Sequence, residues 1–357
     1  MSANFWEGKN VFLTGHTGFK GSWLSLLLQS LNANVTGYAL PPPTDLNMFR
    51  LASVENGMNS IVGDIRETDN LFKALKKSKA DIVIHLAAQP LVRYSYDNPI
   101  ETYAVNVMGT INLLETVRRC ETVRSVVNVT SDKCYENKEW NWAYRENEAL
   151  GGYDPYSNSK ACSELVTSAY RSSFFNEKNF KDHKTAIASA RAGNVIGGGD
   201  WSLDRLIPDL VRAVANNQEI AIRNPKSIRP WQHVLEPLKG YLLLAEHLYV
   251  YGPEFAEAWN FGPNDNDTKS VEQILDIFTH YWGREIKINI KKDLNEPHEA
   301  FNLKIDSTKA KNRLGWLPRW DADESVRRTC AWYKAYINQE NMQLYALKEI
   351  SEYKMLN

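Results

Sequence analysis

The sequence predicts an α/β protein built on a doubly wound, mostly parallel sheet, with a smaller, discontinuous substrate-binding domain. Three features predict this class. Short β-branched runs alternate with amphipathic stretches in the first half, a glycine-rich turn follows the first run, and the alternation becomes irregular after residue 197. Continuous apolar runs of this kind are typical of parallel strands that helices bury on both faces. With 357 residues, of which 43% are hydrophobic, the chain can bury a sizeable core.

The predicted elements alternate along the chain. Helical periodicity at 22–31, 68–78 and 100–119 separates the predicted strands and completes a series of β-α-β units. The strand-like runs are 11–15, 34–40, 60–65, 81–88, 125–131 and the apolar stretch within 185–197.

Two domains are expected from this pattern. Residues 1–190 form the cofactor-binding domain, and the chain returns to it at about 235–263, where a helical pattern is followed by a strand pattern. Residues 191–234 and 264–337 form the second domain. The polar tail at 338–357 either packs as a helix or frays.

Charge and cysteine usage exclude several classes of partner. Forty-two basic and 43 acidic residues leave a net charge of -1, so no global positive field is present to hold nucleic acid or an anionic membrane surface. No run approaches the ~20 apolar residues of a spanning helix, and the N-terminus lacks a signal-peptide pattern, so we expect a cytoplasmic protein. The four cysteines are scattered without paired metal spacing, which favours ordinary thiols and no metal site.

The glycine-rich turn has the placement of a dinucleotide-binding site. Gly15, Gly18 and Gly21 follow a predicted strand and open a predicted helix, with the spacing GxxGxxG rather than GxGxxG. Glycine lets the backbone approach a pyrophosphate, which free amides and the helix dipole then stabilise. The turn therefore predicts a Rossmann domain that binds NAD or NADP.

The choice between NAD and NADP stays open in these residues. The second strand ends in Tyr38-Ala39-Leu40-Pro41, without the carboxylate that usually binds the adenosine ribose. Arg50 could meet a 2′-phosphate or simply be solvated. Asp64, after the third strand, is placed either to accept a hydrogen bond from the adenine amino group or to cap its loop.

A tyrosine and a lysine one helical turn apart indicate redox chemistry on a hydroxyl group. Tyr156 and Lys160 form a YxxxK pair on one face of a predicted helix, downstream of a strand that ends in Thr130-Ser131. An ammonium beside the phenol, with a positively charged nicotinamide nearby, is expected to lower the phenol pKa toward neutrality. Tyrosinate can then take a hydroxyl proton during hydride transfer.

With these motifs in place, the chain resembles the extended short-chain dehydrogenases, which share a glycine turn, an HLAA segment (85–88 here), a strand ending in a hydroxyl residue, and YxxxK. The resemblance implies NAD as cofactor. It implies that Ser131 hydrogen-bonds the reacting sugar oxygen, that Tyr156 is the base, and that Lys160 also binds the nicotinamide ribose. Asn106 is expected to support the active-site helix. The residues expected to contact the cofactor are Gly15, Gly18, Phe19, Gly21, Asp64, Ile65, Leu86, Ala87, Ala88, Tyr156 and Lys160.

Asp132 and Lys133, directly after Ser131, distinguish the possible reactions. Epimerases and simple reductases of this superfamily need no acid and base there, whereas a nucleotide-sugar 4,6-dehydratase must remove the C5 proton and expel the C6 hydroxyl. The Asp-Lys pair resembles the CDP-glucose 4,6-dehydratase group of the family, as do FKGSW (19–23), AQPLVR (88–93), NVIGGGDW (194–201) and RPWQHV (229–234). The resemblance implies CDP-D-glucose as substrate. No residue establishes cytosine recognition by spacing or composition.

The same resemblance implies a set of substrate contacts. Asn194 and Arg229 should meet the diphosphate, Arg205 is a further candidate, and Arg93 should lie near the sugar or phosphates. Arginine suits this role because its planar fork binds phosphate oxygens bidentately, although each arginine could instead form a surface salt bridge. The expected substrate-binding residues are Gln89, Arg93, Ser131, Asn194, Arg205 and Arg229. Trp201 and Trp231 either wall the pocket or pack the two lobes together.

Three alternatives remain open in the sequence. Lys133 either removes the C5 proton or stays protonated and stabilises the enolate. The chain could instead be another nucleotide-sugar dehydratase, an epimerase or a reductase, or a non-catalytic NAD(P)-binding sensor. A homodimer is expected through a four-helix contact of residues 100–119 and 156–175.

Overall fold

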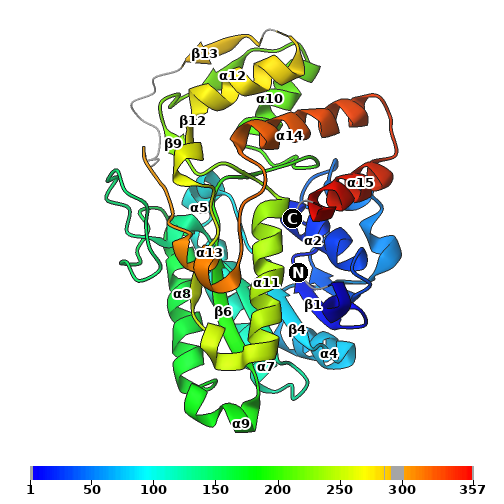
Figure 1. The fold of residues 1–357 in the computed structure, drawn as a ribbon, viewed down its shortest axis with the longest axis vertical. Coiled ribbons are helices and arrows are strands. Elements are labelled where there is room, and N and C mark those ends of the chain that lie inside the picture. Colours follow the sequence, from blue (N-terminus) through cyan, green and yellow to red (C-terminus); the bar gives the residue numbers. More distant parts are fainter. Residues whose placement is uncertain (1–2, 285, 291–300, 356–357) are drawn as a thin grey trace.

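A computed structural model describes residues 3–284, 286–290 and 301–355 (Figure 1). Its centre is a seven-stranded sheet in the order β11-β6-β5-β4-β1-β2-β3, in which every pairing is parallel. The strands are β1 (Asn10–Thr14), β2 (Asn34–Ala39), β3 (Asn59–Val62), β4 (Ile82–His85), β5 (Ser125–Val129), β6 (Ala186–Arg191) and β11 (Ala258–Asn260). The predicted fold class, a doubly wound parallel sheet, is confirmed.

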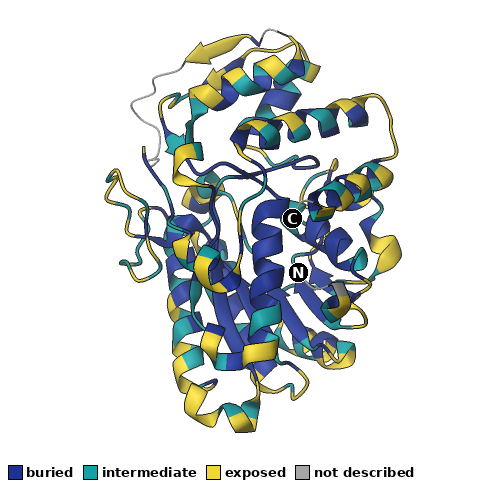
Figure 2. Cartoon of the chain, viewed as in Figure 1, coloured by how far each residue is buried: buried dark blue, intermediate teal, exposed yellow. Residues whose placement is uncertain are grey.

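Both faces of the sheet are buried because successive strand residues point to opposite sides. In β1, Val11 and Leu13 join one apolar core, and Phe12 joins the other. Figure 2 shows the sheet buried between its helices. The first core is covered by α2 (Phe19–Gln29) and α11 (Leu235–Tyr251), and the second by α4 (Thr68–Ser78), α7 (Gly109–Arg118) and α8 (Pro155–Ser173).

The smaller lobe lies beyond the carboxyl end of the sheet, where Figure 1 shows α10, α12, α14 and β13 together. Its helices are α10 (Leu206–Ala215), α12 (Val271–Trp282) and α14 (Ala322–Ile337), and its short strands form three pairs. The pairs are β7 (Val195–Ile196) with β10 (Gln232–His233), β8 (Ile220–Ile222) with β13 (Ile288–Ile290), and β9 (Ile228–Arg229) with β12 (Lys269–Ser270).

Short helical segments connect these elements. Short α-helices are α1 (Ala3–Trp6), α3 (Met48–Leu51), α5 (Val92–Asp97), α6 (Pro99–Tyr103), α9 (Phe180–His183) and α13 (Thr308–Leu314). Single turns are η1 (Val54–Gly57), η2 (Ala104–Met108), η3 (Asp132–Cys134), η4 (Glu177–Asn179), η5 (Gly252–Phe255) and η6 (Asp265–Asp267).

The helix predicted at 100–119 is interrupted. It consists of α6, the π-helical turn η2 and α7. Asn106 lies in the π turn, where its amide donates to the carbonyl of Gln89 (3.0 Å) and to Ser159 Oγ on α8 (2.9 Å). Single π-helical turns within α-helices occur frequently at functional sites. The contact with α8 agrees with the support expected from Asn106.

The C-terminal tail packs as a helix rather than fraying. Helix α15 (Met342–Met355) is anchored by Tyr353, whose hydroxyl donates to Glu236 Oε2 on α11 (2.8 Å). Glu349 lies 3.3 Å from His233 of β10, and both side chains are buried. Across the described residues, no helix has both the length and the apolar character needed to cross a membrane.

Candidate active site

The glycine turn between β1 and α2 requires glycine at two of its three positions. Gly15 has a φ of +76°, and a methyl group there would approach the backbone nitrogen of Ala87 to 2.7 Å. A methyl group at Gly21 would overlap the carbonyl oxygen of Gly15. Gly18 is the N-cap residue of α2, with no side chain to cover the helix amides. The turn is therefore a compact cradle of exposed backbone donors, followed by Phe19.

The HLAA segment is held against this turn. Thr14 Oγ1 accepts hydrogen bonds from the amides of Leu86 and Ala87, both at 3.2 Å. The same oxygen lies 2.7 Å from Nδ1 of buried His85. Since β1 and β4 are neighbours at the point where strand order reverses, residues 86–88 line the crevice in which such sheets bind ligands.

Asp64 is engaged by its own loop. Its Oδ1 accepts from the backbone amide of Arg66 (2.8 Å), and the Arg66 guanidinium binds its carboxylate, which holds the pKa of Asp64 below its ordinary value. These contacts favour the loop-cap alternative for Asp64. Ile65 is buried, and a methyl group at Gly109 would lie 2.8 Å from its side chain.

Ser131 organises the turn that carries the candidate acid and base. As the N-cap residue of η3, it accepts from the amide of Lys133 (3.2 Å), and its hydroxyl donates to Asp132 Oδ1 (3.1 Å). The Ser131 hydroxyl also acts on the Tyr156 phenol, whose pKa it lowers. One hydroxyl therefore joins the predicted base of the oxidation step to the predicted acid of the elimination step.

Tyr156 and Lys160 lie in the first turns of α8, as their spacing predicts. The helix begins at Pro155, and Asp154 caps it by accepting from the amide of Ser157 (2.9 Å). Lys160 is buried, and its ammonium donates to the carbonyl of Val129 at 3.5 Å. Burial lowers the pKa of Lys160 to about 8.

The protein's own groups raise the pKa of Tyr156, so the expected lowering depends on the charge of a nicotinamide. Burial raises this pKa to about 12, although the hydrogen bond with Ser131 and the charge of Arg205 act in the opposite direction. The cost of placing a phenolate among buried groups exceeds the effect of these neighbours.

Asp132 has the properties of a proton donor. Its side chain is 1% exposed, and burial raises its pKa, against the charges of Lys133, Arg229 and Lys20. Its Oδ2 has no hydrogen-bond partner within the described residues. Lys133 is half-buried beside it. The charge of Asp132 acts on the pKa of Tyr156, which brings these two side chains into one region, and Lys133 follows Asp132 in η3.

The residues predicted to bind the diphosphate converge on the same region. Arg229 is buried, and Nη1 donates to the carbonyls of Ile228 (2.9 Å) and Phe301 (3.1 Å). Arg205, the N-cap residue of α10, pairs with Asp200 Oδ2 at 3.1 Å. Asn194 is half-buried and has a φ of +35°, a conformation that few non-glycine residues adopt.

Two other predicted substrate contacts have partners within the protein. The Gln89 side chain donates to the carbonyl of Leu91 (3.1 Å) and to Thr102 Oγ1 (2.9 Å), which locks it into its own loop. Arg93 forms an ion pair with Asp204 at 3.5 Å, at the edge of a cavity of about 450 Å³.

The tryptophans pack the lobes. The Trp201 ring meets those of Tyr333 and Tyr336 edge to face, with both centroid distances 5.3 Å. Trp231 is buried, and its Nε1 donates to the carbonyl of Lys269 (3.1 Å). These contacts favour the packing alternative for both residues.

Sequence reasoning missed two neighbours of the catalytic residues. Lys20, inside the glycine turn, is affected by the charges of Arg205, Asp132 and Lys160, and burial lowers its pKa to about 7. The position of Lys20 among the three glycines of the turn is the sequence signal that could have identified it. Gly193 lies against Asp132, and any side chain there would overlap the carboxyl group. No local pattern marks that contact.

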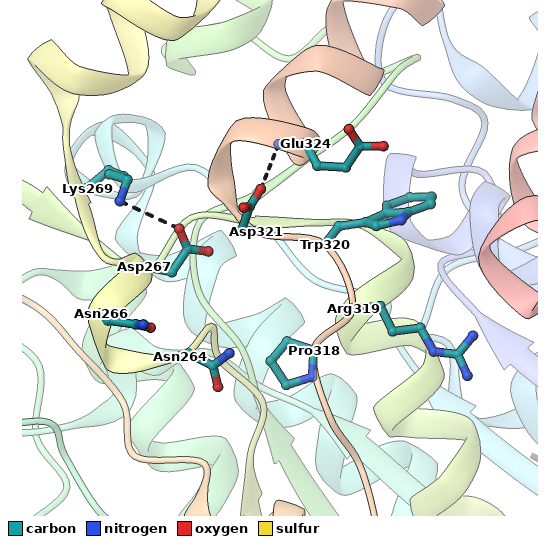
Figure 3. A pocket seen from close by; sticks show the side chains of 9 residues that line it. All are labelled: Asn264, Asn266, Asp267, Lys269, Pro318, Arg319, Trp320, Asp321 and Glu324. Atoms are coloured by element: carbon teal, nitrogen blue, oxygen red, sulfur yellow. Dashed lines mark hydrogen bonds and ion pairs between the residues drawn. The ribbon is translucent and has the colours of Figure 1, made fainter. Parts of the chain in front are cut away.

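A second hollow of about 460 Å³ lies at the surface of the smaller lobe (Figure 3). Its charged groups include Asp267, which pairs with Lys269 at 3.6 Å, and Asp321, which caps α14 through the amide of Glu324 (2.8 Å). None of the predicted site residues lines it.

Comparison with known proteins identifies the family. The family model described as GDP-mannose 4,6 dehydratase matches residues 12–329. The chain belongs to the GDP-mannose 4,6 dehydratase family. This membership confirms the family resemblance seen in the sequence, and the match spans both lobes.

Relatives and solved structures refine this placement within the family. The CDP-glucose 4,6-dehydratase of Salmonella typhimurium (strain LT2) is 56% identical over 353 residues, covering 99% of this chain and 98% of the relative. The dTDP-D-glucose 4,6-dehydratase of Mus musculus is 24% identical and covers 94% of this chain and 92% of its own. A double mutant of dTDP-glucose 4,6-dehydratase from Streptomyces venezuelae, solved with NAD, has a TM-score of 0.79 at 21% identity, over 92% of this chain and 98% of that one. At this identity the structural match supports the fold.

Proposed function

We propose that this chain is an NAD-dependent lyase that converts CDP-D-glucose to CDP-4-dehydro-6-deoxy-D-glucose and water. The observation that carries the proposal is the buried, raised-pKa carboxyl of Asp132, joined through Ser131 to Tyr156. An acid at this place serves the elimination of water, which an epimerase or a reductase does not perform. The 56% identity to a CDP-glucose 4,6-dehydratase supports the choice of substrate.

The glycine turn fits a dinucleotide. Side chains at Gly15 or Gly21 would fill the cradle, and the uncapped start of α2 presents its amides where a pyrophosphate would lie. Residues 86–88 and the Tyr156–Lys160 pair would hold the nicotinamide end. When bound there, NAD supplies the hydride acceptor for C4 and the hydride donor for C6.

Oxidation at C4 requires removal of the 4-hydroxyl proton. Tyr156 takes this proton, and Ser131 hydrogen-bonds the same sugar oxygen. The ammonium of Lys160, one helical turn away, supplies positive charge near the phenolate that forms. Because burial raises the Tyr156 pKa, this nearby charge is needed for the base to form at working pH.

Elimination follows because the 4-keto group makes the C5 proton acidic. Lys133 removes that proton, and Asp132, whose protonated form burial favours, donates a proton to the departing C6 oxygen. The oxygen leaves as water. Reprotonation at C5 by Lys133 restores the base. The proton that Tyr156 took from the 4-hydroxyl must then pass to Asp132, so that both residues return to their starting states. The alternative, in which Lys133 stays charged and stabilises the enolate, makes a different prediction for C5 exchange.

The buried guanidinium of Arg229 and the side chain of Asn194 would bind the diphosphate, with Arg205 beside them. Arg93, at the edge of the cavity of about 450 Å³, would contact the sugar or phosphates. Charge-assisted hydrogen bonds from arginine suit phosphate oxygens.

We also propose that the chain forms two domains. Residues 1–190 and 235–263 form the cofactor-binding domain, and residues 191–234 and 264–337 form the substrate-binding domain.

The deciding experiment is incubation of the purified protein and NAD with CDP-, dTDP- and GDP-linked sugars. CDP-glucose should yield a 4-keto-6-deoxy product with no net NADH. A stoichiometric change in the absorbance of NADH at 340 nm would indicate a reductase or dehydrogenase. NAD binding without any turnover would indicate a sensor. Preference for another nucleotide would place the chain among the other dehydratases.

We further propose that the protein is a cytoplasmic homodimer. Exposed apolar residues lie on the neighbouring helical segments α6, η2 and α8, where Ile100 is 85%, Met108 50% and Leu165 58% exposed. Burial of this face against a second copy would remove it from water. All four cysteines are free thiols, as in a reducing compartment. Light scattering of the wild type and of a Leu165→Arg variant tests the dimer.

A further inference from the structure

A buried ionic network lies behind the Tyr156–Lys160 pair. Glu164 and Arg191 form an ion pair at 2.8 Å, and each side chain is 3% exposed. The Glu164 carboxylate also accepts hydrogen bonds from Thr130 Oγ1 and Ser189 Oγ. These interactions keep the pKa of Glu164 below its ordinary value despite burial, so the group is an anion in the protein core.

The four-residue spacing along α8 places the Glu164 carboxylate next to the catalytic residues. Tyr156, Lys160 and Glu164 are spaced by four residues and form one stripe along the helix. Lys160 donates to the carbonyl of Val129, and Glu164 accepts from the next residue, Thr130. The ammonium and the carboxylate therefore bind adjacent residues at the end of β5, directly before Ser131.

Other elements add little negative charge around Lys160. Burial raises the pKa of the Cys134 thiol on η3, so this group is neutral. Burial lowers the pKa of His85 on β4 to about 3, so the imidazole is neutral as well. Lys20, on α2, contributes positive charge. Among the described groups that affect Lys160, Glu164 is the one that carries a negative charge at neutral pH.

We propose that Glu164 is a positioning residue for the reaction, which keeps the Lys160 ammonium and the Thr130–Ser131 strand end in the geometry that Tyr156 requires. This inference rests on the proposed function, because it assigns Lys160 its role there. Burial favours the neutral amine of Lys160, and the charge of Glu164 opposes this effect. Arg191 in turn keeps Glu164 ionised.

The test is the pH dependence of kcat/KM in a Glu164→Gln variant. Loss of the anion lowers the pKa of Lys160, so the ammonium is lost at a lower pH and the alkaline limb of the profile moves down by about one pH unit. Glu164→Asp keeps the charge and should restore the wild-type limb. An alkaline limb in Glu164→Gln that coincides with that of the wild type would overturn the inference.

Ser189→Ala is the matched control. It removes one hydrogen bond to Glu164 but leaves the charge in place, so the Tm should fall while the alkaline limb stays where it is. If Ser189→Ala moves the limb as far as Glu164→Gln does, packing rather than charge is responsible, and the inference is wrong.

A variant that fails to fold, and a failure of the proposed function, can each be distinguished from a failure of this inference. Glu164→Gln leaves the Arg191 guanidinium buried without its anion, which is strongly destabilising. Should that variant not fold, the double variant Glu164→Gln/Arg191→Met removes both charges and should shift the limb in the same direction by a smaller amount. An unmoved limb there also contradicts the inference. The pH dependence of the NAD dissociation constant reports the Lys160 charge without turnover, so failure to dehydrate CDP-glucose would refute the proposed function alone.

Discussion

Oδ2 of Asp132 packs directly against the backbone of Gly193, in the space that any larger side chain at residue 193 would occupy. The two residues come from different strand ends, since Asp132 follows β5 and Gly193 follows β6. The neighbouring parallel strands bring them together. The position of the candidate acid therefore depends on the absence of a side chain at a residue that takes no part in the chemistry.

Gly193→Ala should displace the Asp132 carboxyl and slow elimination more than oxidation. We expect the rate of dehydration to fall by about 10²-fold, the range typical of a mispositioned acid or base. Single-turnover experiments that follow NADH at 340 nm together with the 4-keto-6-deoxy product measure both steps. Gly283→Ala controls for loss of stability, because its φ of +78° strains any side chain there while a methyl group meets no atom within 4 Å. Equal slowing of both steps in Gly193→Ala would contradict the assignment.

Asp132→Asn tests the acid itself. An amide has nearly the shape of the carboxyl but cannot donate the proton in the same way, so elimination should slow by about 10²- to 10⁴-fold. Reduced cofactor should then accumulate in a single turnover. Asp265→Asn, at a side chain that is 81% exposed, controls for the change in charge. Dehydration at the native rate in Asp132→Asn would rule out the proposed donor.

Lys133→Met separates the two roles open to the lysine. If Lys133 is the C5 base, solvent deuterium entry at C5 should be lost, while oxidation at C4 continues. NMR of the product and single-turnover absorbance measure the two events. A variant that still exchanges C5 at the native rate would assign Lys133 no role in proton transfer.

Gly21→Ala should weaken NAD binding. The added methyl group overlaps the carbonyl oxygen of Gly15, so the turn must open and its amides move away from the pyrophosphate. We expect the NAD dissociation constant to rise by at least about tenfold, a difference of roughly 1.4 kcal/mol. Calorimetry measures it. Unchanged affinity would show that the cofactor does not lie on this turn.

Two buried histidines should make the protein less stable in mild acid. Burial lowers the pKa of His85 to about 3 and that of His16 to about 4, below the ordinary value of 6.5. As the pH falls below 6.5, the unfolded chain binds protons at these residues before the folded protein does, so the free energy of unfolding decreases. The loss approaches about 1.4 kcal/mol per histidine for each pH unit well below 6.5, until the folded pKa is reached.

Urea unfolding at pH 7 and pH 5 measures this effect. In His85→Gln the difference in the free energy of unfolding between the two pH values should shrink by about 1 to 2 kcal/mol, because one titrating group is removed. The comparison is made within each variant, so a uniform loss of stability does not affect it. An unchanged difference would mean that His85 is protonated in the folded protein.

Local spacing in the sequence was sufficient to predict the fold and the centre of the site. The β-branched runs predicted six of the seven central strands, and a strand pattern after a predicted helix predicted the return at β11, because continuous apolar runs reflect burial on both faces of a sheet. The spacing of Tyr156 and Lys160 likewise placed both on one face of α8, since four residues make about one helical turn.

Only the tertiary structure brought Gly193 against Asp132, Glu164 against Arg191, and Lys20 beside the catalytic turn. It also decided how the protein's own groups act on the Tyr156 pKa, which burial raises. Close packing and desolvation depend on groups that are far apart in the chain, and no local pattern records them. The residue types of the chemistry are therefore readable in sequence, whereas their protonation and supporting contacts arise from the folded environment.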